Sequence, residues 1–168
     1  MGEIAVGKKA PDFELPTDGD GVFRLSKHAN KSVVLYFYPK DDTPGCTAEG
    51  IAFTGLADQF ADSNAMIVGI SSDSPKSHDR FKAKYELSVI LAADAEKEVS
   101  NLYGVWVQKS RYGRKYMGVE RTTFLVGPDG RIVRIWRKVK VKDHADEVLQ
   151  AVTELGSRRP RDDQNTDH

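Results

Sequence analysis

Cys46 is the only cysteine in the 168 residues, and it lies in the stretch TPGCTAEG from Thr43 to Gly50. A single cysteine cannot form an internal disulfide, and structural zinc needs several thiolate or imidazole ligands at short spacing. Two interpretations of the side chain remain, a small buried filler and a reactive thiol. Composition alone favours the filler, because most lone cysteines of cytosolic proteins are structural.

The position of Cys46 favours the reactive thiol instead. An apolar, strand-like run ends at Pro39 and a helical pattern begins at Pro44, so Thr43 becomes the N-cap and Cys46 the third helical residue. The first turn of a helix has unpaired N–H groups and the positive end of the helix dipole, which stabilise a thiolate and lower the thiol pKa below its usual value of about 8.5. Gly45 leaves the approach to the sulfur open.

Three thiol chemistries are compatible with such a position, and the sequence separates them. Dithiol oxidoreductases need C-x-x-C, but Thr43 stands where the first cysteine would be, and the chain has no proline between Pro75 and Pro128 to serve as the usual cis-proline. A cysteine hydrolase needs a positioned histidine base. Attack on a peroxide oxygen needs only a thiolate and donors that polarise the O–O bond. The histidines are scattered, and each is interpreted as a solvated or hydrogen-bonded side chain: His28, His78, His144 and His168.

The stretch PKDDTPGCTAE contains P-x-x-x-T-x-x-C, which resembles the signature of the peroxiredoxins. The later runs LYGVW and KYMGVERTTFLVGPDG resemble the subgroup named for bacterioferritin comigratory protein, or peroxiredoxin Q. The resemblance covers residues 10 to about 152. It implies that Cys46 is the peroxidatic nucleophile, that Thr43 hydrogen-bonds the peroxide, that Pro39 shields the thiolate from water and that Arg121 holds thiolate and substrate.

The same resemblance implies a thiol-dependent peroxidase that reduces hydrogen peroxide and organic hydroperoxides through a sulfenic acid on Cys46, without a cofactor or metal. Many relatives carry a resolving cysteine five residues later, where this chain has Ile51. Reduction is therefore expected from an external thiol: thioredoxin, glutaredoxin or a low-molecular-weight thiol. A redox-sensing or interaction protein, oxidised at Cys46 without efficient turnover, remains the alternative.

The role of Glu49, as a support of the active-site loop or a solvated side chain, stays open. A monomer is expected, with a dimer as the other arrangement.

The elements that must position these residues follow from periodicity and turn signals. The run VVLYFY predicts a strand buried on both faces, and apolar residues recurring every four positions predict a helix from Pro44 to about Asp62. Ser74 and Pro75 are typical of a helix start, and Asp94 is expected to cap another short helix. Further strands are expected over 13–15, 22–25, 65–72, 89–92, 122–126 and 131–136, an irregular basic segment over 105–120, and a last helix over about 143–155.

This order of elements, β-α-β-α, an insertion, then β-β-α, predicts an α/β fold of the thioredoxin-like sandwich type. We expect a central mixed β-sheet with helices on both faces and an N-terminal β-hairpin extension. Residues 1–155 are predicted to form a single domain. The tail over 156–168, GSRRPRDDQNTDH, has no large apolar residue and is predicted to be disordered.

Charge and hydropathy limit the partners. Lys and Arg total 25 and Asp and Glu total 25, so no net field attracts nucleic acid or acidic membranes. No apolar run has the length of a signal peptide core or a membrane span, which predicts a soluble, cytoplasmic protein that binds neither nucleic acid nor membrane. The basic run from Arg131 to Lys142 is interpreted as charge that keeps a sheet edge soluble, rather than as a nucleic-acid patch.

Overall fold

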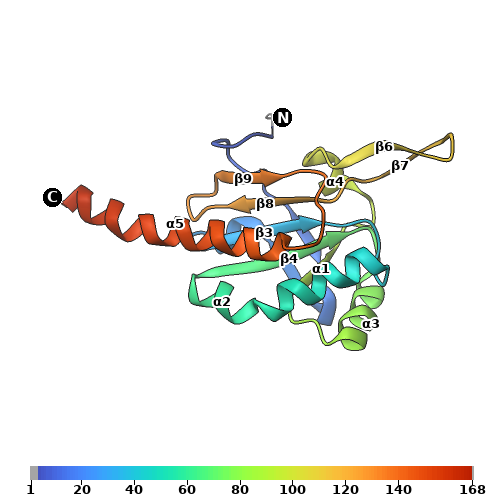
Figure 1. Cartoon of the computed structure of the whole chain (residues 1–168), viewed down its shortest axis with the longest axis horizontal. Coiled ribbons are helices and arrows are strands. Elements are labelled where there is room, and N and C mark those ends of the chain that lie inside the picture. Colours follow the sequence, from blue (N-terminus) through green and yellow to red (C-terminus); the bar gives the residue numbers. More distant parts are fainter. Residues whose placement is uncertain (1–3, 168) are drawn as a thin grey trace.

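A five-stranded mixed sheet forms the centre of the computed structural model, which describes the backbone of residues 4–167 and the side chains of residues 4–156 (Figure 1). The strand order is β5-β4-β3-β8-β9. β3 pairs in parallel with β4 and β4 with β5, whereas β8 runs antiparallel to both β3 and β9. The strands are β3 (Ser32–Phe37), β4 (Ala65–Ser71), β5 (Ile90–Ala93), β8 (Thr122–Val126) and β9 (Ile132–Trp136). The predicted mixed sheet is confirmed.

The central strand β3 is buried on both faces, as its continuous apolar run predicts. Successive side chains of a strand point to opposite faces, so β3 supplies two separate cores. Leu35 and Phe37 belong to the core on one face, while Val34 and Tyr36 belong to the core on the other. The end of β3 is therefore fixed from both sides, directly before the loop that leads to Cys46.

Helices cover both faces of the sheet, which confirms the predicted sandwich. On the Tyr36 face lie α1 (Pro44–Gly55), α2 (Ala57–Asp62), α3 (Pro75–Tyr85) and α5 (His144–Asp167). On the Phe37 face lie α4 (Glu98–Leu102) and the N-terminal hairpin of β1 (Glu14–Pro16) and β2 (Val22–Arg24). Ser74 caps α3 by accepting a hydrogen bond from the Ser77 amide at 3.1 Å, as predicted.

The helix predicted over 44–62 is broken in the structure. Leu56 has φ −107° and ψ 8°, and it separates α1 from α2. Gly55 ends α1, and glycine is a weak helix former, so the break falls where the local preference for helix is lowest. Phe53 and Phe60, one on each side of the break, are both buried in the same core.

The segment predicted to be irregular over 105–120 is in fact regular. It forms a two-stranded antiparallel ribbon of β6 (Trp106–Arg111) and β7 (Arg114–Val119). Tyr112 and Gly113 make the turn, with φ of 52° and 77°, the left-handed pair that suits a two-residue hairpin. The prediction failed because most of the ribbon is exposed, so its sequence lacks the apolar alternation that identifies a half-buried strand. Figure 1 shows the ribbon projecting from the body of the molecule.

The last helix differs from its prediction at the end. α5 continues to Asp167, whereas the sequence predicts an end near Leu155 and disorder from Gly156. Ala145, Val148, Ala151 and Val152 anchor the first part of α5 in the core. The boundary of the domain at residue 155 stays a prediction. Within residues 4–167, no helix has both the length and the hydropathy that crossing a bilayer requires.

Candidate active site

Cys46 is the third residue of α1, behind the loop that leaves the carboxyl end of β3. Thr43 occupies the N-cap position with extended φ and ψ of −106° and 156°, and its carbonyl accepts the helical hydrogen bond from the Thr47 amide at 2.8 Å. The helix start predicted from the sequence is confirmed. The Cys46 side chain is buried, with 2% of its surface exposed. Its sulfur therefore lies in the first turn, where free N–H groups and the helix dipole favour an anion.

The hydroxyl of Thr43 differs from the expected cap. It makes no hydrogen bond to the helix amides and instead donates to the Lys40 carbonyl at 2.8 Å. The hydroxyl hydrogen is thereby engaged, and the oxygen keeps lone pairs that can accept from another group. Because the side chain does not cap α1, the N–H groups of the first turn are not used by Thr43.

Arg121 approaches the sulfur from a distant part of the chain. It lies between β7 and β8, and its Nη2 donates to Cys46 Sγ at 3.3 Å. A Cβ atom on Gly45 would lie 3.0 Å from this same Nη2, which is tighter than ordinary packing, so glycine at this position leaves room for the guanidinium beside the thiol. The side chain of Arg121 is 17% exposed. The structure thus excludes the alternative that Arg121 is an ordinary surface arginine.

Glu49 completes a cluster that sequence reasoning left open. Arg121 Nη1 donates to Glu49 Oε1 at 2.6 Å, and Glu49 is 1% exposed, so it is not a solvated side chain. Burial raises the pKa of Glu49 to about 7, although Arg121 opposes the shift. The second carboxyl oxygen, Oε2, has no hydrogen-bond partner among the described residues. The spacing of three residues between Cys46 and Glu49, which places both on one helix face, was the signal available in the sequence.

The charge of Arg121 is held between two acidic groups. Burial lowers the pKa of the guanidinium, but the nearby Glu49 and Cys46 outweigh it and raise the pKa above its ordinary value. The guanidinium fork directs one nitrogen at the carboxyl and the other at the sulfur. This arrangement supplies a fixed positive charge and a hydrogen-bond donor at the sulfur, which is what a thiolate nucleophile requires.

A buried polar network fixes the loop between β3 and α1, and the sequence did not predict it. Asp41 is buried and accepts hydrogen bonds from the hydroxyls of Tyr38 and Ser77 at 2.6 and 2.8 Å. Its Oδ2 also lies 2.7 Å from Nδ1 of His78, whose Nε2 faces the Ala92 carbonyl at 3.0 Å. His78 is thus a hydrogen-bonded core histidine, as expected. Neither Asp41 nor His78 belongs to a sequence motif that would have singled it out.

Pro39 is the remaining predicted site residue. Only Tyr38 separates it from the end of β3, and its side chain is half-buried. It lies in the same loop as Asp41 and Thr43. Its expected shielding of the sulfur stays a prediction.

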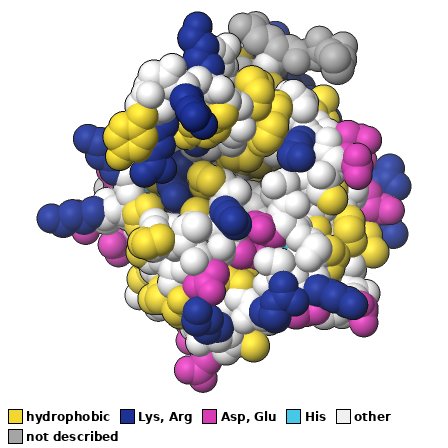
Figure 2. Space-filling view, turned by 90° about the vertical axis from the view of Figure 1, so that its right-hand side faces the viewer, with side chains coloured by type: hydrophobic (Ala, Val, Ile, Leu, Met, Phe, Trp, Pro, Cys, Tyr) yellow, Lys and Arg dark blue, Asp and Glu magenta, His cyan; other side chains and the backbone are white. Residues whose placement is uncertain are grey.

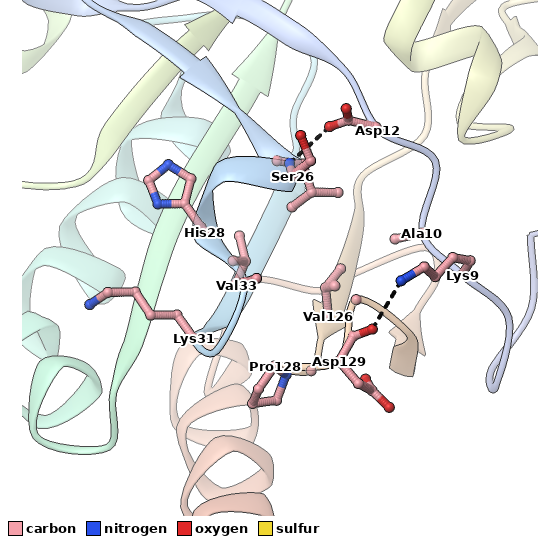
Figure 3. Close-up of a pocket in the computed structure, with 14 residues that line it drawn as sticks. Lys9, Ala10, Asp12, Ser26, His28, Lys31, Val33, Val126, Pro128 and Asp129 are labelled. Carbon is pink, nitrogen blue, oxygen red and sulfur yellow. Dashed lines mark hydrogen bonds between the residues drawn. The ribbon is translucent and has the colours of Figure 1, made fainter.

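A separate pocket of about 200 Å³ lies at the other end of the central strands (Figure 3). Val33 and Val126, at the start of β3 and the end of β8, line it together with Pro128, and Lys9 donates to the Asp129 carbonyl at its rim. None of the predicted site residues lines this pocket. Thiol chemistry is therefore confined to the opposite end of β3, where Cys46 lies.

The chain is similar to known proteins over most of its length. Residues 6–135 match the model of the AhpC/TSA family. The chain is 44% identical over 155 residues to peroxiredoxin Bcp of Bacillus subtilis, covering 92% of this chain and 99% of that protein. It is 49% identical over 146 residues to the putative peroxiredoxin bcp of Coxiella burnetii, covering 87% and 97%.

Solved structures give the same result. A cysteine-to-serine mutant of Xylella fastidiosa peroxiredoxin Q superposes with a TM-score of 0.86 at 39% identity, covering 92% of this chain and 98% of that one. Xanthomonas campestris bacterioferritin comigratory protein has a TM-score of 0.82 at 42% identity, covering 86% and 92%. With one cysteine in the whole sequence, the chain belongs to the peroxiredoxins of the AhpC/TSA family, in the Bcp or peroxiredoxin Q subgroup, and is a thiol-dependent peroxidase of the one-cysteine form.

Proposed function

We propose that Cys46 is the nucleophile of this peroxidase and that Arg121, Thr43 and Pro39 assist it. The observation that carries the proposal is the 3.3 Å contact between Arg121 Nη2 and Cys46 Sγ at the start of α1. The thiolate attacks the nearer oxygen of a peroxide ROOH. The S–O bond forms as the O–O bond breaks, Cys46 becomes a sulfenic acid, and the other oxygen leaves as RO⁻ and is protonated to ROH.

Each assisting residue has a defined task. The guanidinium of Arg121 stabilises the thiolate and donates to the oxygen on which negative charge develops. The Thr43 hydroxyl donates to the Lys40 carbonyl, so its oxygen accepts a hydrogen bond from the peroxide O–H and orients it. Pro39 excludes water from the sulfur. Glu49 positions Arg121 through the 2.6 Å hydrogen bond and does not itself touch the peroxide.

The substrates proposed are hydrogen peroxide and organic hydroperoxides. The Xanthomonas campestris relative is described by its alkyl peroxide reduction activity, which supports the organic class. Because the chain has no second cysteine, the sulfenic acid is reduced by an external thiol: thioredoxin, glutaredoxin or a low-molecular-weight thiol. A monomer working in the reducing cytoplasm fits this chemistry, with a dimer as the other arrangement.

The decisive experiment compares wild type with Cys46→Ser in peroxide consumption supported by dithiothreitol. Wild type is expected to consume many equivalents of hydrogen peroxide per chain, and the serine variant none. Activity retained by the variant would remove Cys46 from the mechanism. Consumption of one equivalent by wild type, with no further turnover at saturating thiol, would instead identify a redox sensor oxidised at Cys46.

A further inference from the structure

The β6–β7 ribbon, residues 106–119, is an exposed element that the peroxide chemistry does not use. It carries four cationic side chains and no carboxylate, although the whole chain has zero net charge. The positive residues are Lys109, Arg111, Arg114 and Lys115 in the strands, and the charge of Arg111 also lies 5.4 Å from the centre of the Tyr112 ring. Among the described residues, β6 and β7 pair only with each other and not with the central sheet.

A further cationic side chain, Arg121, lies two residues beyond the end of β7. The ribbon is thus continuous with the guanidinium that contacts Cys46. Its base is closed by the hydrogen bond from the Glu120 amide to the Val105 carbonyl at 2.8 Å. Figure 1 shows the ribbon and the start of α1 at the same end of the molecule.

The pairing register shows which side chains share a face of the ribbon. Residues directly opposite each other in an antiparallel pair lie on one face, as does every second residue along each strand. Lys109 pairs with Tyr116 and Arg111 with Arg114, so all four side chains lie on one face. The stem of Lys109 and the ring of Tyr116 both come within 3.6 Å of the place where a Cβ of Gly118 would lie. This face, defined by Lys109, Arg111, Arg114 and Tyr116, is called the basic face below.

The basic face adjoins the active site. Burial lowers the pKa of Lys109, and the charge of Arg121 lowers it further, while Glu120 and Cys46 act in the opposite direction. Lys109 is therefore close enough to both Arg121 and Cys46 to feel their charges. At about 3.4 Å per residue, a six-residue strand carries Arg111 and Arg114 about 17 Å from the base of the ribbon. Lys109, at the base of the basic face, is thus the cation of the ribbon that lies nearest to the Cys46 cluster.

The exposed aromatic side chains of the ribbon are of residue types that are common in protein–protein interfaces. Tyr116 on the basic face is 46% exposed and Tyr112 at the turn is 91% exposed, whereas Met117, which is 49% exposed, pairs with Gln108 and lies on the opposite face. Tyrosine and arginine are enriched where proteins bind one another. Figure 2 views the molecule from this side, and its upper part shows Lys and Arg side chains lying among hydrophobic ones.

We propose that the basic face of the β6–β7 ribbon docks the reductant of Cys46, and that this reductant is an acidic dithiol protein. The inference rests on the proposed function, because it concerns the thiol that regenerates Cys46. Charge complementarity selects an acidic partner. A second copy of this chain would bring the same cations into contact and be repelled. Nucleic acid would satisfy the charge, but it has no thiol to offer the sulfenic acid.

The redox step balances with the dithiol as the only reductant. One thiol of the docked protein attacks the sulfenic sulfur, an S–S bond forms between the two proteins, and the hydroxyl leaves as water. The second thiol of the partner then attacks the partner's first sulfur in the mixed disulfide. The bond to Cys46 breaks, and Cys46 leaves as a thiolate. The partner is thereby oxidised by two electrons, from a dithiol to an internal disulfide.

The test measures recycling separately from peroxide reduction in the variant Arg111→Glu/Arg114→Glu. Both residues are exposed and lie outside the catalytic cluster. The reductant is a thioredoxin of net negative charge, kept reduced by its reductase and NADPH, and dithiothreitol serves as a small neutral reductant. We expect the rate constant for recycling by thioredoxin to fall about tenfold or more at low ionic strength, as for steered association, and the loss to shrink as salt is added.

The matched control is Lys27→Glu/Lys31→Glu, which makes the same charge change at exposed positions before the start of β3, at the other end of the sheet. This variant is expected to be recycled almost as fast as wild type. All three proteins are expected to react equally fast with hydrogen peroxide and with dithiothreitol. A chain that fails to react with peroxide at Cys46 would contradict the proposed function, whereas normal peroxide and dithiothreitol rates isolate the docking step.

Several results would overturn the docking proposal. One is an equal rate constant for recycling of wild type and Arg111→Glu/Arg114→Glu by the acidic thioredoxin. Another is a fall in this rate constant for Lys27→Glu/Lys31→Glu that is as large as the fall for the arginine variant. Failure of the thioredoxin to recycle wild type, with dithiothreitol fully effective, would also count against it. If the arginine variant lost binding to a DNA oligonucleotide or dissociated a dimer in sedimentation, with recycling unchanged, the ribbon would serve nucleic acid or self-association instead.

Discussion

Arg121 Nη2 lies 3.3 Å from Cys46 Sγ, although 75 residues separate the two in the chain. The contact depends on the sheet, because β3 leads into the Cys46 helix and Arg121 immediately precedes β8, which pairs with β3. The antiparallel pairing of Phe37 with Thr122 places the end of one segment beside the start of the other. The site is thus assembled where neighbouring strands end and begin.

Replacing Arg121 should slow the reaction of Cys46 with peroxide. Arg121→Ala removes the donor and the charge at the sulfur, and we expect the rate constant to fall about 100-fold, equivalent to about 3 kcal/mol, as when one oxyanion donor is lost. Arg121→Lys keeps the charge, but an ammonium group lacks the planar fork that donates to Glu49 and Cys46 at the same time. The rate constant of this variant should therefore lie between those of Arg121→Ala and wild type. Single-turnover stopped-flow kinetics measures both. A rate for the alanine variant within about a factor of two of wild type would contradict the role proposed for this residue.

Gly45 should be intolerant of a methyl group for the same reason. In Gly45→Ala, the added Cβ would lie 3.0 Å from Arg121 Nη2, so the guanidinium must shift from its present position beside the sulfur. We expect a slower peroxide reaction with little loss of helix. Gly55→Ala is the matched control, because it lies in the same helix and a Cβ there meets nothing within 4 Å. Equal rates for the two variants in stopped-flow measurements would show that the position of Arg121 does not depend on Gly45.

Glu49 should make the folded protein less stable as the pH rises. Its pKa is about 7 when folded, above the ordinary value of 4.5, so between these pH values the folded state holds a proton that the unfolded state releases. The free energy of unfolding therefore falls with rising pH across this window, by about 3 kcal/mol in total at about 1.4 kcal/mol per pKa unit. Glu49→Gln lacks this dependence.

Urea unfolding at pH 5 and pH 8 measures the effect, in a Cys46→Ser background that removes the ionisation of the thiol. His144 titrates with the opposite sign, because burial and the nearby Arg121 and Arg134 lower its pKa to about 4, but it is present in both proteins and its contribution largely cancels in the comparison. The same change between the two pH values with and without Glu49 would refute the assignment.

Asp41 should matter far more to stability than its neighbour Asp42. Asp41→Asn disturbs a buried carboxylate that accepts from Tyr38, Ser77 and His78, and we expect a loss of about 3 kcal/mol in the free energy of unfolding. Asp42→Asn removes exposed contacts with Lys84 and Tyr85 and should change stability little. Denaturant unfolding compares the two, and equal losses would mean that the buried network does not stabilise the loop.

Oxidised Cys46 should accumulate as a sulfenic acid when no thiol is present. Stoichiometric peroxide is expected to add one oxygen, excess peroxide two or three, and a monothiol to give a mixed disulfide, all read from intact mass. The place of a resolving cysteine is taken by Ile51, which is exposed. A predominant Cys46-to-Cys46 dimer would show that a second chain supplies the resolving sulfur.

Ile51→Cys extends this prediction. Residues five apart in a helix are separated by about 7.5 Å along its axis, farther than a disulfide reaches. A bond between Cys46 and a cysteine at this position therefore requires α1 to unwind. Oxidation of the variant should form the disulfide together with a loss of helical circular dichroism. A disulfide formed with the helix signal unchanged would contradict this expectation.

The sequence by itself determined the local elements of this protein and predicted that Cys46 is its nucleophile. The apolar run of β3, the Thr43-Pro44 helix start and the turn GPDG between β8 and β9 act over a few residues, so they can be recognised without knowing the fold. They placed Cys46 in the first turn of α1. The resemblance to the peroxiredoxins then named Arg121, which no local pattern distinguished from a surface arginine.

Only the tertiary structure decided which side chains meet. The burial of Glu49, the 3.3 Å contact of Arg121 with the sulfur and the network around Asp41 join residues 36 to 75 positions apart. The β6–β7 ribbon escaped prediction because its exposed faces carry no apolar period. Local preferences act between near neighbours in the chain, whereas contacts between distant segments depend on how the strands pair. For that reason the sequence could predict a reactive cysteine at position 46, whereas only the fold shows the buried guanidinium and carboxyl that surround it.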